Sequence, residues 1–242
     1  MLTVTNLVKK FDGVTAVDGV SFEIKPGEIF SLIGPNSSGK TTIVKSIAGL
    51  LRIDKGTILV DGNDVAKKPK EAKSVIGYIP DEPSVWGVMT GEEFLHFVGA
   101  LYGMTPERRK MRIALLLPLF GIEGIEKEQF QNYSRGNKQK ISILAAFLHE
   151  PKLILIDEPI VGLDPESAIV AKQMLTDFAA AGGAVLLVTH TLPVAEEIST
   201  QIGVLKKGKL LTTGTFANLR AEAKLAGSAT LEHVYTALTA SR

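Results

Sequence analysis

The chain has 242 residues, 45% of them hydrophobic, and its 27 basic and 26 acidic residues leave a formal net charge of +1. This size and composition predict one α/β domain, or one with a helical insertion, and the balanced charge gives no reason to expect a nucleic-acid partner. Cysteine is absent, which excludes disulfides and thiolate chemistry and fits a reducing cytosol.

Short strands dominate the first part of the chain. Apolar or alternating runs, separated by glycine and aspartate turns, predict strands at residues 2–8, 20–24, 29–33 and 57–60. A helix-like run at residues 42–51 follows the third of them. We expect an antiparallel β layer beside the strand at 29–33.

The middle of the chain has helical periodicity, in the segments 92–102, 107–120 and 138–148. In the last segment apolar residues recur at i, i+3, i+4 and i+7, and such a stripe needs a packing partner. We interpret residues 82–150, approximately, as an α-helical subdomain inserted in the core. No apolar run reaches the roughly 20 residues of a membrane-spanning helix, so another chain would have to cross any membrane that this protein serves.

The second half of the chain contains a βαβ pattern. Apolar runs at residues 153–157 and 184–189 flank a predicted helix at 165–181, and strands buried on both faces of a parallel sheet have this character. From residue 215 the sequence is mixed helix and loop. We divide the chain into a domain of residues 1–220 and a C-terminal helical tail of residues 221–242.

A candidate phosphate-binding loop lies between the strand at 29–33 and the helix-like run. Residues 34–41 have the spacing G-x-x-x-x-G-K-T, in which glycines let the backbone approach a polyphosphate and the helix N-terminus adds positive charge. Lys40 supplies a charge to the outer phosphates, and Thr41 offers a hydroxyl to Mg²⁺. The alternative is an ordinary glycine-rich turn, which the strand-loop-helix context disfavours. The candidate nucleotide-binding residues are Gly34, Pro35, Asn36, Ser37, Ser38, Gly39, Lys40, Thr41 and Thr42.

Polar residues follow the two strands of the βαβ pattern. Ligands of open parallel sheets bind beyond the carboxyl ends of the strands, so these residues are candidates for chemistry. Asp157 is placed to hold Mg²⁺, while Glu158 can orient and polarise an attacking water. His190 can donate to a terminal phosphate or position the water. Taken alone, an acidic turn and a turn histidine are the simpler interpretations, and the phosphate-binding loop upstream reverses that preference.

A second candidate anion site precedes the helix that begins near Lys138. Ser134, Gly136 and the open amides of a helix start can bind an anion. Plain N-capping by Ser134 is the alternative. Two anion sites far apart in the chain suggest that one nucleotide is gripped from two sides.

These motifs resemble those of the ATP-binding cassette (ABC) ATPases, and the resemblance covers the chain from residue 1 to about residue 214. Residues 34–41 are similar to their Walker A motif, 153–158 to Walker B with Glu158 as the catalytic glutamate, and His190 to the switch histidine. Residues 162–165 are similar to the D-loop. The residues that resemble the family signature are Tyr133, Ser134, Arg135, Gly136 and Asn137, with Tyr133 and Arg135 where the family usually has leucine and glycine.

The resemblance also gives Phe11 and Asp81 expected places. Phe11 sits where the family has an aromatic that stacks on adenine; a core phenylalanine on the first strand is the alternative. Asp81 stands where the family usually has glutamine, and a carboxylate can approach Mg²⁺ but cannot donate as an amide does. We count Asp81 as a third candidate metal ligand, after Thr41 and Asp157.

The stretch after Asp81 is where the resemblance implies contact with a membrane partner. Val85, Trp86 and Val88 could serve that docking or pack onto the helices.

The resemblance implies a P-loop ATPase that powers a membrane transporter of the bacterial export type, with a separate permease chain and a place on the cytoplasmic face of the membrane. Two copies, or one copy and a close relative, would sandwich two ATP molecules with Mg²⁺. Lys40, Glu158 and His190 are the expected catalytic residues. The alternatives are a soluble, nucleotide-switched assembly factor and a degenerate cassette that binds ATP without hydrolysing it.

Overall fold

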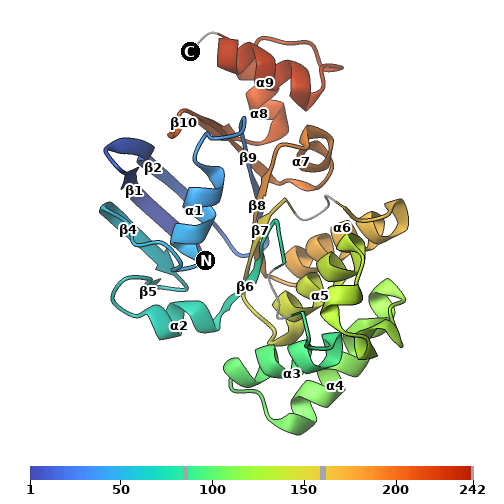
Figure 1. The fold of residues 1–242 in the computed structure, drawn as a ribbon. Coiled ribbons are helices and arrows are strands. Elements are labelled where there is room, and N and C mark those ends of the chain that lie inside the picture. Colours follow the sequence, from blue (N-terminus) through green and yellow to red (C-terminus); the bar gives the residue numbers. More distant parts are fainter. Residues whose placement is uncertain (84–86, 159–161, 241–242) are drawn as a thin grey trace.

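A computed structural model of the chain describes residues 1–83, 87–158 and 162–240 (Figure 1). The strands are β1 (Leu2–Phe11), β2 (Val14–Ile24), β3 (Ile29–Ile33), β4 (Lys55–Val60), β5 (Asn63–Asp64), β6 (Ile76–Ile79), β7 (Leu153–Asp157), β8 (Ala184–Thr189), β9 (Gln201–Lys206) and β10 (Lys209–Gly214). The α-helices are α1 (Lys40–Ile47), α2 (Pro69–Ser74), α3 (Gly91–Leu101), α4 (Pro106–Leu116), α5 (Arg135–Leu148), α6 (Pro165–Ala180), α7 (Leu192–Ile198), α8 (Phe216–Glu222) and α9 (Leu231–Ala240). None of the helices in these ranges is long and apolar enough to pass through a bilayer.

The central sheet has the strand order β10-β9-β3-β8-β7-β6. Strands β6, β7, β8, β3 and β9 run parallel to their neighbours, and β10 returns antiparallel to β9. Every residue of β3, β7 and β8 is buried, as expected of central strands that are covered on both faces. The carboxyl ends of these three adjacent strands therefore meet at one edge of the sheet.

A second, antiparallel sheet lies beside the central one, with the order β2-β1-β4-β5. Its inner face shares a core with α1 and one face of the central sheet, through residues such as Leu7, Ile43 and Leu186. In Figure 1 α1 stands between the blue antiparallel sheet and the central sheet, with α5 and α6 on the opposite side. The predicted P-loop α/β fold with a parallel sheet and a flanking antiparallel layer is confirmed.

The helices α3, α4 and α5 follow β6 and precede β7 in the sequence, and they pack against one another. The stripe of α5 is buried through Ile141, Leu144 and Leu148, which share a core with Leu95 of α3 and Ile113 of α4. Figure 1 shows α3 and α4 below α5, at the end of the sheet that carries β6. The inserted helical region is therefore present, although its exact boundaries stay a prediction.

Two predicted helices were wrong at their ends. The segment 107–120 is not one helix: α4 ends at Leu116, and a 3₁₀ turn, Leu117–Phe120, follows. Pro118 has no N–H to continue the α-helical ladder. The helix expected at 42–51 begins at Lys40 and ends at Ile47. It ends early because Gly49, with a φ of 66°, takes the left-handed conformation that closes a helix.

Candidate nucleotide site

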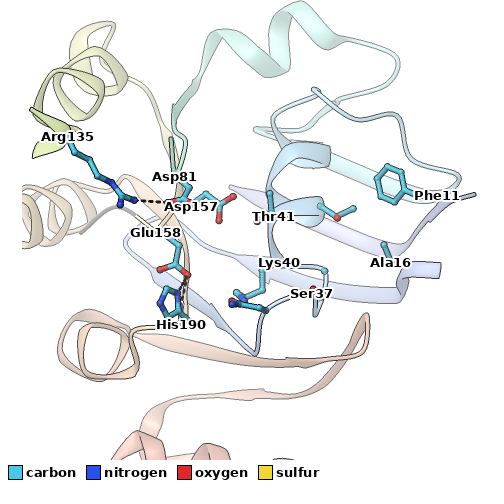
Figure 2. A pocket seen from close by; sticks show the side chains of 13 residues that line it. Phe11, Ala16, Ser37, Lys40, Thr41, Asp81, Arg135, Asp157, Glu158 and His190 are labelled. Atoms are coloured by element: carbon cyan, nitrogen blue, oxygen red, sulfur yellow. Dashed lines mark hydrogen bonds and ion pairs between the residues drawn. The ribbon is translucent and has the colours of Figure 1, made fainter. Parts of the chain in front are cut away.

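A cavity of about 610 Å³ opens at the carboxyl edge of the central sheet. Figure 2 shows Phe11 and Ala16 at one end of it, Lys40 and Thr41 in the middle, and Asp81 with Arg135 at the other end. The lining residues are Phe11, Ala16, Asn36, Ser37, Gly39, Lys40, Thr41, Thr42, Asp81, Arg135, Asp157, Glu158 and His190. The cavity thus joins segments that lie far apart in the chain, from Phe11 to His190.

The loop between β3 and α1 forms one wall of the cavity. Ser37 has a positive φ of 63°, and Gly39 has a φ of 105°. A Cβ atom added at Gly39 would lie 2.5 Å from the carbonyl oxygen of Ala16, so only glycine fits there. The loop turns its backbone toward the cavity, and α1 then presents its N-terminus to the same space.

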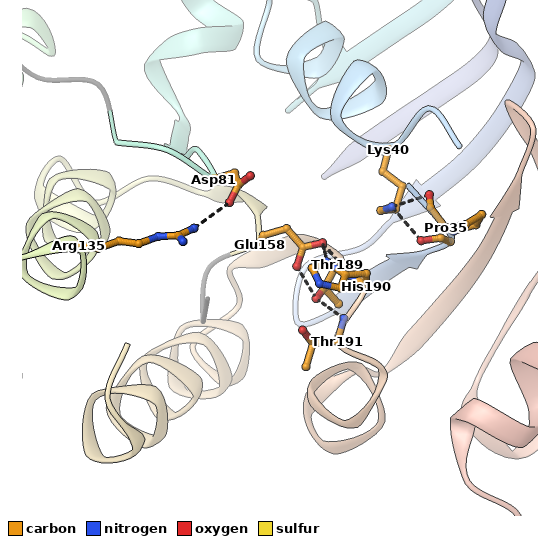
Figure 3. Close-up of polar contacts among 9 residues, drawn as sticks. Pro35, Lys40, Asp81, Arg135, Glu158, Thr189, His190 and Thr191 are labelled. Carbon is orange, nitrogen blue, oxygen red and sulfur yellow. Dashed lines mark hydrogen bonds and ion pairs between the residues drawn. The ribbon is translucent and has the colours of Figure 1, made fainter. Parts of the chain in front are cut away.

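Lys40, the first residue of α1, is 8% exposed. Its Nζ donates to the carbonyl oxygens of Gly34 at 2.8 Å and Pro35 at 3.0 Å (Figure 3). Burial lowers the pKa of Lys40, and the nearby carboxylates of Glu158 and Asp157 act in the opposite direction. Two neutral carbonyls compensate a buried ammonium only in part, so a polyphosphate is a better partner for this charge.

Asp157 ends β7 and is 3% exposed. Burial raises the pKa of this carboxyl, and a hydrogen bond from the Thr41 side chain lowers it; Asp81 and Glu158 raise it further through their negative charge. Thr41 and Asp157 thus place a hydroxyl and a carboxylate next to each other. These are hard oxygen ligands of the kind that Mg²⁺ prefers, and two protein ligands are typical where a nucleotide and water complete the coordination. The donor set therefore fits Mg²⁺.

Glu158 is held by three donors at the tip of the sheet (Figure 3). The Thr189 hydroxyl donates to Oε2 at 2.9 Å, while the backbone N–H of His190 donates to Oε1 at 2.7 Å. The His190 ring contacts the same Oε1 through Nδ1, also at 2.7 Å. Glu158 has a φ of 55°, a conformation that costs a non-glycine residue free energy and is found at functional sites. Both carboxylate oxygens are therefore fixed from neighbouring β8.

The segment before α5 divides into buried and exposed residues. Tyr133 is 6% exposed and donates from its hydroxyl to the carbonyl oxygen of Ile125 at 2.6 Å, so it is a core residue of the helical region. Ser134 caps α5 by accepting from the N–H of Asn137 at 3.1 Å. Arg135 extends from the start of α5 into the cavity.

Comparison with known proteins identifies the family. A family model described as ABC transporter matches residues 17–161. The "ABC-type transporter ATP-binding protein EcsA" of Bacillus subtilis (strain 168) is 34% identical over 99% of this chain and 96% of its own length. The chain belongs to the ABC transporter family.

Two further comparisons agree that this chain is an ABC ATPase. The "Linearmycin resistance ATP-binding protein LnrL" of the same organism is 35% identical over 90% of this chain and 70% of its own length. A solved structure titled "Structure of ATP binding subunit of ABC transporter" has a TM-score of 0.94 and 33% identity, with 99% of each chain covered. The protein is an ATP-binding ATPase subunit that energises an ABC transporter.

The fold of this ABC ATPase brings most of the predicted site residues together on the wall of one cavity. The predicted catalytic and metal-binding residues on the cavity wall are Lys40, Thr41, Asp81, Asp157, Glu158 and His190. Phe11 is 42% exposed, so it is not a core residue. Gly34, Pro35 and Ser38 belong to the same loop but do not line the cavity, and Ser38 is 2% exposed. Of the signature-like residues in the described part of the chain, Arg135 alone reaches this cavity.

Two features of the site were missed at the sequence level. Ala16 lines the cavity beside Phe11, and no local pattern points to an alanine in that place. Thr189, next to His190, holds Glu158, and its position at the end of a buried strand could have indicated it. Of the predicted docking residues, Val88 is 72% exposed, and Val85 and Trp86 lie outside the described residues.

Proposed function

We propose that this ABC ATPase is the ATP-hydrolysing subunit of an export-type transporter, and that ATP drives two such subunits together. The observation that carries the proposal is the convergence of Lys40, Thr41, Asp157 and Glu158 on one cavity. The resistance function named for LnrL favours export over import.

Nucleotide binding is assigned along the length of the cavity. Phe11 stacks on the base, with Ala16 beside it. Residues 34–42 wrap the phosphates, all except Pro35 having a backbone N–H group, and the N-terminus of α1 adds its positive dipole end. Lys40 leaves its two carbonyl partners and binds the outer phosphates.

Hydrolysis is assigned to the carboxylates of Asp157 and Glu158, on the cavity wall away from Phe11. Thr41 and Asp157 would hold Mg²⁺, which when bound offsets the negative charge of the phosphates. Glu158 orients a water molecule toward the terminal phosphate and accepts its proton, while His190 supports Glu158 through Nδ1 and faces that phosphate. Because Thr189 and His190 fix Glu158 before the substrate arrives, catalysis depends mainly on positioning and preorganised electrostatics.

The proposal includes a second ATPase subunit, identical or related, and a separate permease chain. Residues 133–137 would supply the segment that faces the terminal phosphate of the partner's ATP, with Tyr133 supporting it from the core and Arg135 directed into the cavity of its own subunit. Two nucleotides would then hold the dimer together, and hydrolysis would loosen it. We assign residues 1–220 to the ATPase domain, with the helical subdomain at about 82–150, and residues 221–242 to a C-terminal helical tail. The pair would sit on the cytoplasmic face of the membrane.

Nucleotide binding by a Lys40→Ala variant tests the assignment of the cavity. We expect ATP affinity to fall by at least about tenfold, because the ammonium is the one buried cation among the described residues of the cavity wall. Unchanged affinity would contradict the proposal. Co-purification with a membrane-embedded chain tests the transporter role, and a functional ATPase that never associates with such a chain would favour a soluble assembly factor.

A further inference from the structure

The two residues that depart from the family motifs, Asp81 and Arg135, form an ion pair in this chain. Arg135 Nη2 lies 3.9 Å from Asp81 Oδ1 and joins the start of α5 to the segment after β6 (Figure 3). Both residues line the nucleotide cavity, at the end opposite Phe11 (Figure 2). The pair therefore lies where the terminal phosphate of a bound nucleotide is expected.

The pair adds little to the stability of the fold. Its side chains are 61% and 52% exposed, and an ion pair in such a position contributes at most about 1 kcal/mol to folding. The path of the Arg135 side chain is nevertheless defined. A Cβ atom added at Gly162 would lie 3.1 Å from Arg135 Cδ, so the absence of a side chain at 162 leaves room for the arginine to pass.

The charges on the cavity wall show why the pair matters. Lys40 and Arg135 are its cations in the described chain, and Asp81, Asp157 and Glu158 are its carboxylates. The last two have their own donors: the Thr41 side chain for Asp157, and Thr189 with His190 for Glu158. Within the described residues, the carboxylate of Asp81 accepts no hydrogen bond, and its partner is the guanidinium of Arg135.

We propose that Arg135 is a positioning residue for the nucleotide site: it neutralises Asp81 and holds that carboxylate at the rim of the cavity. Without Arg135, Asp81 becomes a third carboxylate that is free to turn toward the incoming phosphates and repel them. The two departures thus compensate each other, and the pair takes the place of an uncharged side chain. This inference rests on the proposed function of the cavity.

A double-mutant cycle on nucleotide binding tests the inference. ATP and ADP affinities are measured by equilibrium titration for the wild type, Arg135→Gln, Asp81→Asn and the double variant, each with and without Mg²⁺. We expect Arg135→Gln to weaken ATP binding about tenfold, with a smaller effect on ADP, because the terminal phosphate lies nearest the lost charge. Asp81→Asn should bind ATP at least as tightly as the wild type, and the double variant should restore wild-type affinity.

Controls separate this effect from general changes in surface charge and folding. Arg108 and Glu150 form another exposed ion pair, outside the cavity, and Arg108→Gln should leave ATP affinity unchanged. Raising the ionic strength should shrink the defect of Arg135→Gln, because screening weakens repulsion between exposed charges. All variants should unfold within a few degrees of the wild type.

Three outcomes would overturn the inference. Wild-type ATP affinity in Arg135→Gln would show that the charge is not needed. A double variant as weak as Arg135→Gln would mean that Arg135 acts directly on phosphate and not through Asp81. A loss of affinity in Asp81→Asn that appears only with Mg²⁺ would make Asp81 a metal ligand. If Lys40→Ala also binds ATP normally, the proposed function itself fails; if Lys40→Ala alone is weak, only this inference fails.

Discussion

Replacing Thr189 with valine removes one hydroxyl from the support of Glu158. Thr189 is 2% exposed, donates to Glu158 Oε2 at 2.9 Å and accepts from the N–H of Thr191 at 2.9 Å. Valine has nearly the same shape but lacks the hydroxyl. The variant therefore loses two hydrogen bonds without opening a cavity.

The expected loss of stability follows from the kind of bond removed. A hydrogen bond to a charged group contributes about 1.5 to 3 kcal/mol, and the Glu158 side chain is only 10% exposed. Its other oxygen keeps the donors from His190, so the carboxylate is not left without partners. We expect the free energy of unfolding to fall by about 2 kcal/mol, which lowers the unfolding temperature of a chain this size by about 4 to 8 °C.

Thermal unfolding and steady-state ATPase kinetics measure the two consequences of Thr189→Val. Since Thr189 does not line the cavity, KM for ATP should stay nearly constant, while kcat falls about tenfold because Glu158 is less well fixed. Thr189→Ser is the matched control, because it keeps the hydroxyl and should retain most of kcat. Wild-type kcat in the valine variant, or an equal loss of kcat in the serine variant, would refute the reasoning.

Three further predictions concern the base site, the pH dependence of stability and the packing of α5. Phe11→Ala should weaken ATP binding about tenfold in an equilibrium titration, because base stacking on an aromatic ring contributes about 1 to 3 kcal/mol. Burial lowers the pKa of His149 from 6.5 to about 4, so the unfolded chain binds more protons in that range and stability falls as the pH drops through it. His149→Phe, which keeps a ring stacked on Tyr102, should remove about 2 kcal/mol of that fall in denaturant unfolding at pH 7 and pH 4.5. Gly77→Ala should destabilise the fold by about 1 to 3 kcal/mol, because the new Cβ would lie 2.3 Å from the Ala146 carbonyl oxygen, whereas Gly227→Ala, with open space around it, should be neutral in the same assay.

Local sequence patterns were sufficient for the central strands and for the strand, loop and helix arrangement around residues 34–41. The predicted strands at 29–33, 153–157 and 184–189 have the same boundaries as β3, β7 and β8. Each is a continuous apolar run, and burial on both faces is what such a run requires. The G-x-x-x-x-G-K-T spacing can likewise be understood locally, because its glycines let the backbone approach a phosphate and a helix follows directly.

Weaker or longer-range features could not be predicted in the same way. Strand β6 was missed because it has four residues and contains Gly77 and Tyr78, which break the apolar run. β9 and β10 were also missed: the buried run of β9 is short and contains Gly203, and β10 mixes a lysine and two threonines with its apolar residues. The Asp81–Arg135 pair joins two segments that only the folded chain brings together. No local pattern contains the information needed to place those side chains side by side.

The central claim is that ATP bound by the loop around Lys40 is hydrolysed by water that Glu158 positions. The most direct test compares ATP binding and ATP turnover in Glu158→Gln, since glutamine keeps the shape of the side chain but accepts no proton. We expect ATP affinity close to that of the wild type, a turnover lower by about two to four orders of magnitude, and a dimer that persists with ATP and dissociates with ADP. Turnover close to the wild-type rate would contradict the claim and remove Glu158 from the catalytic role.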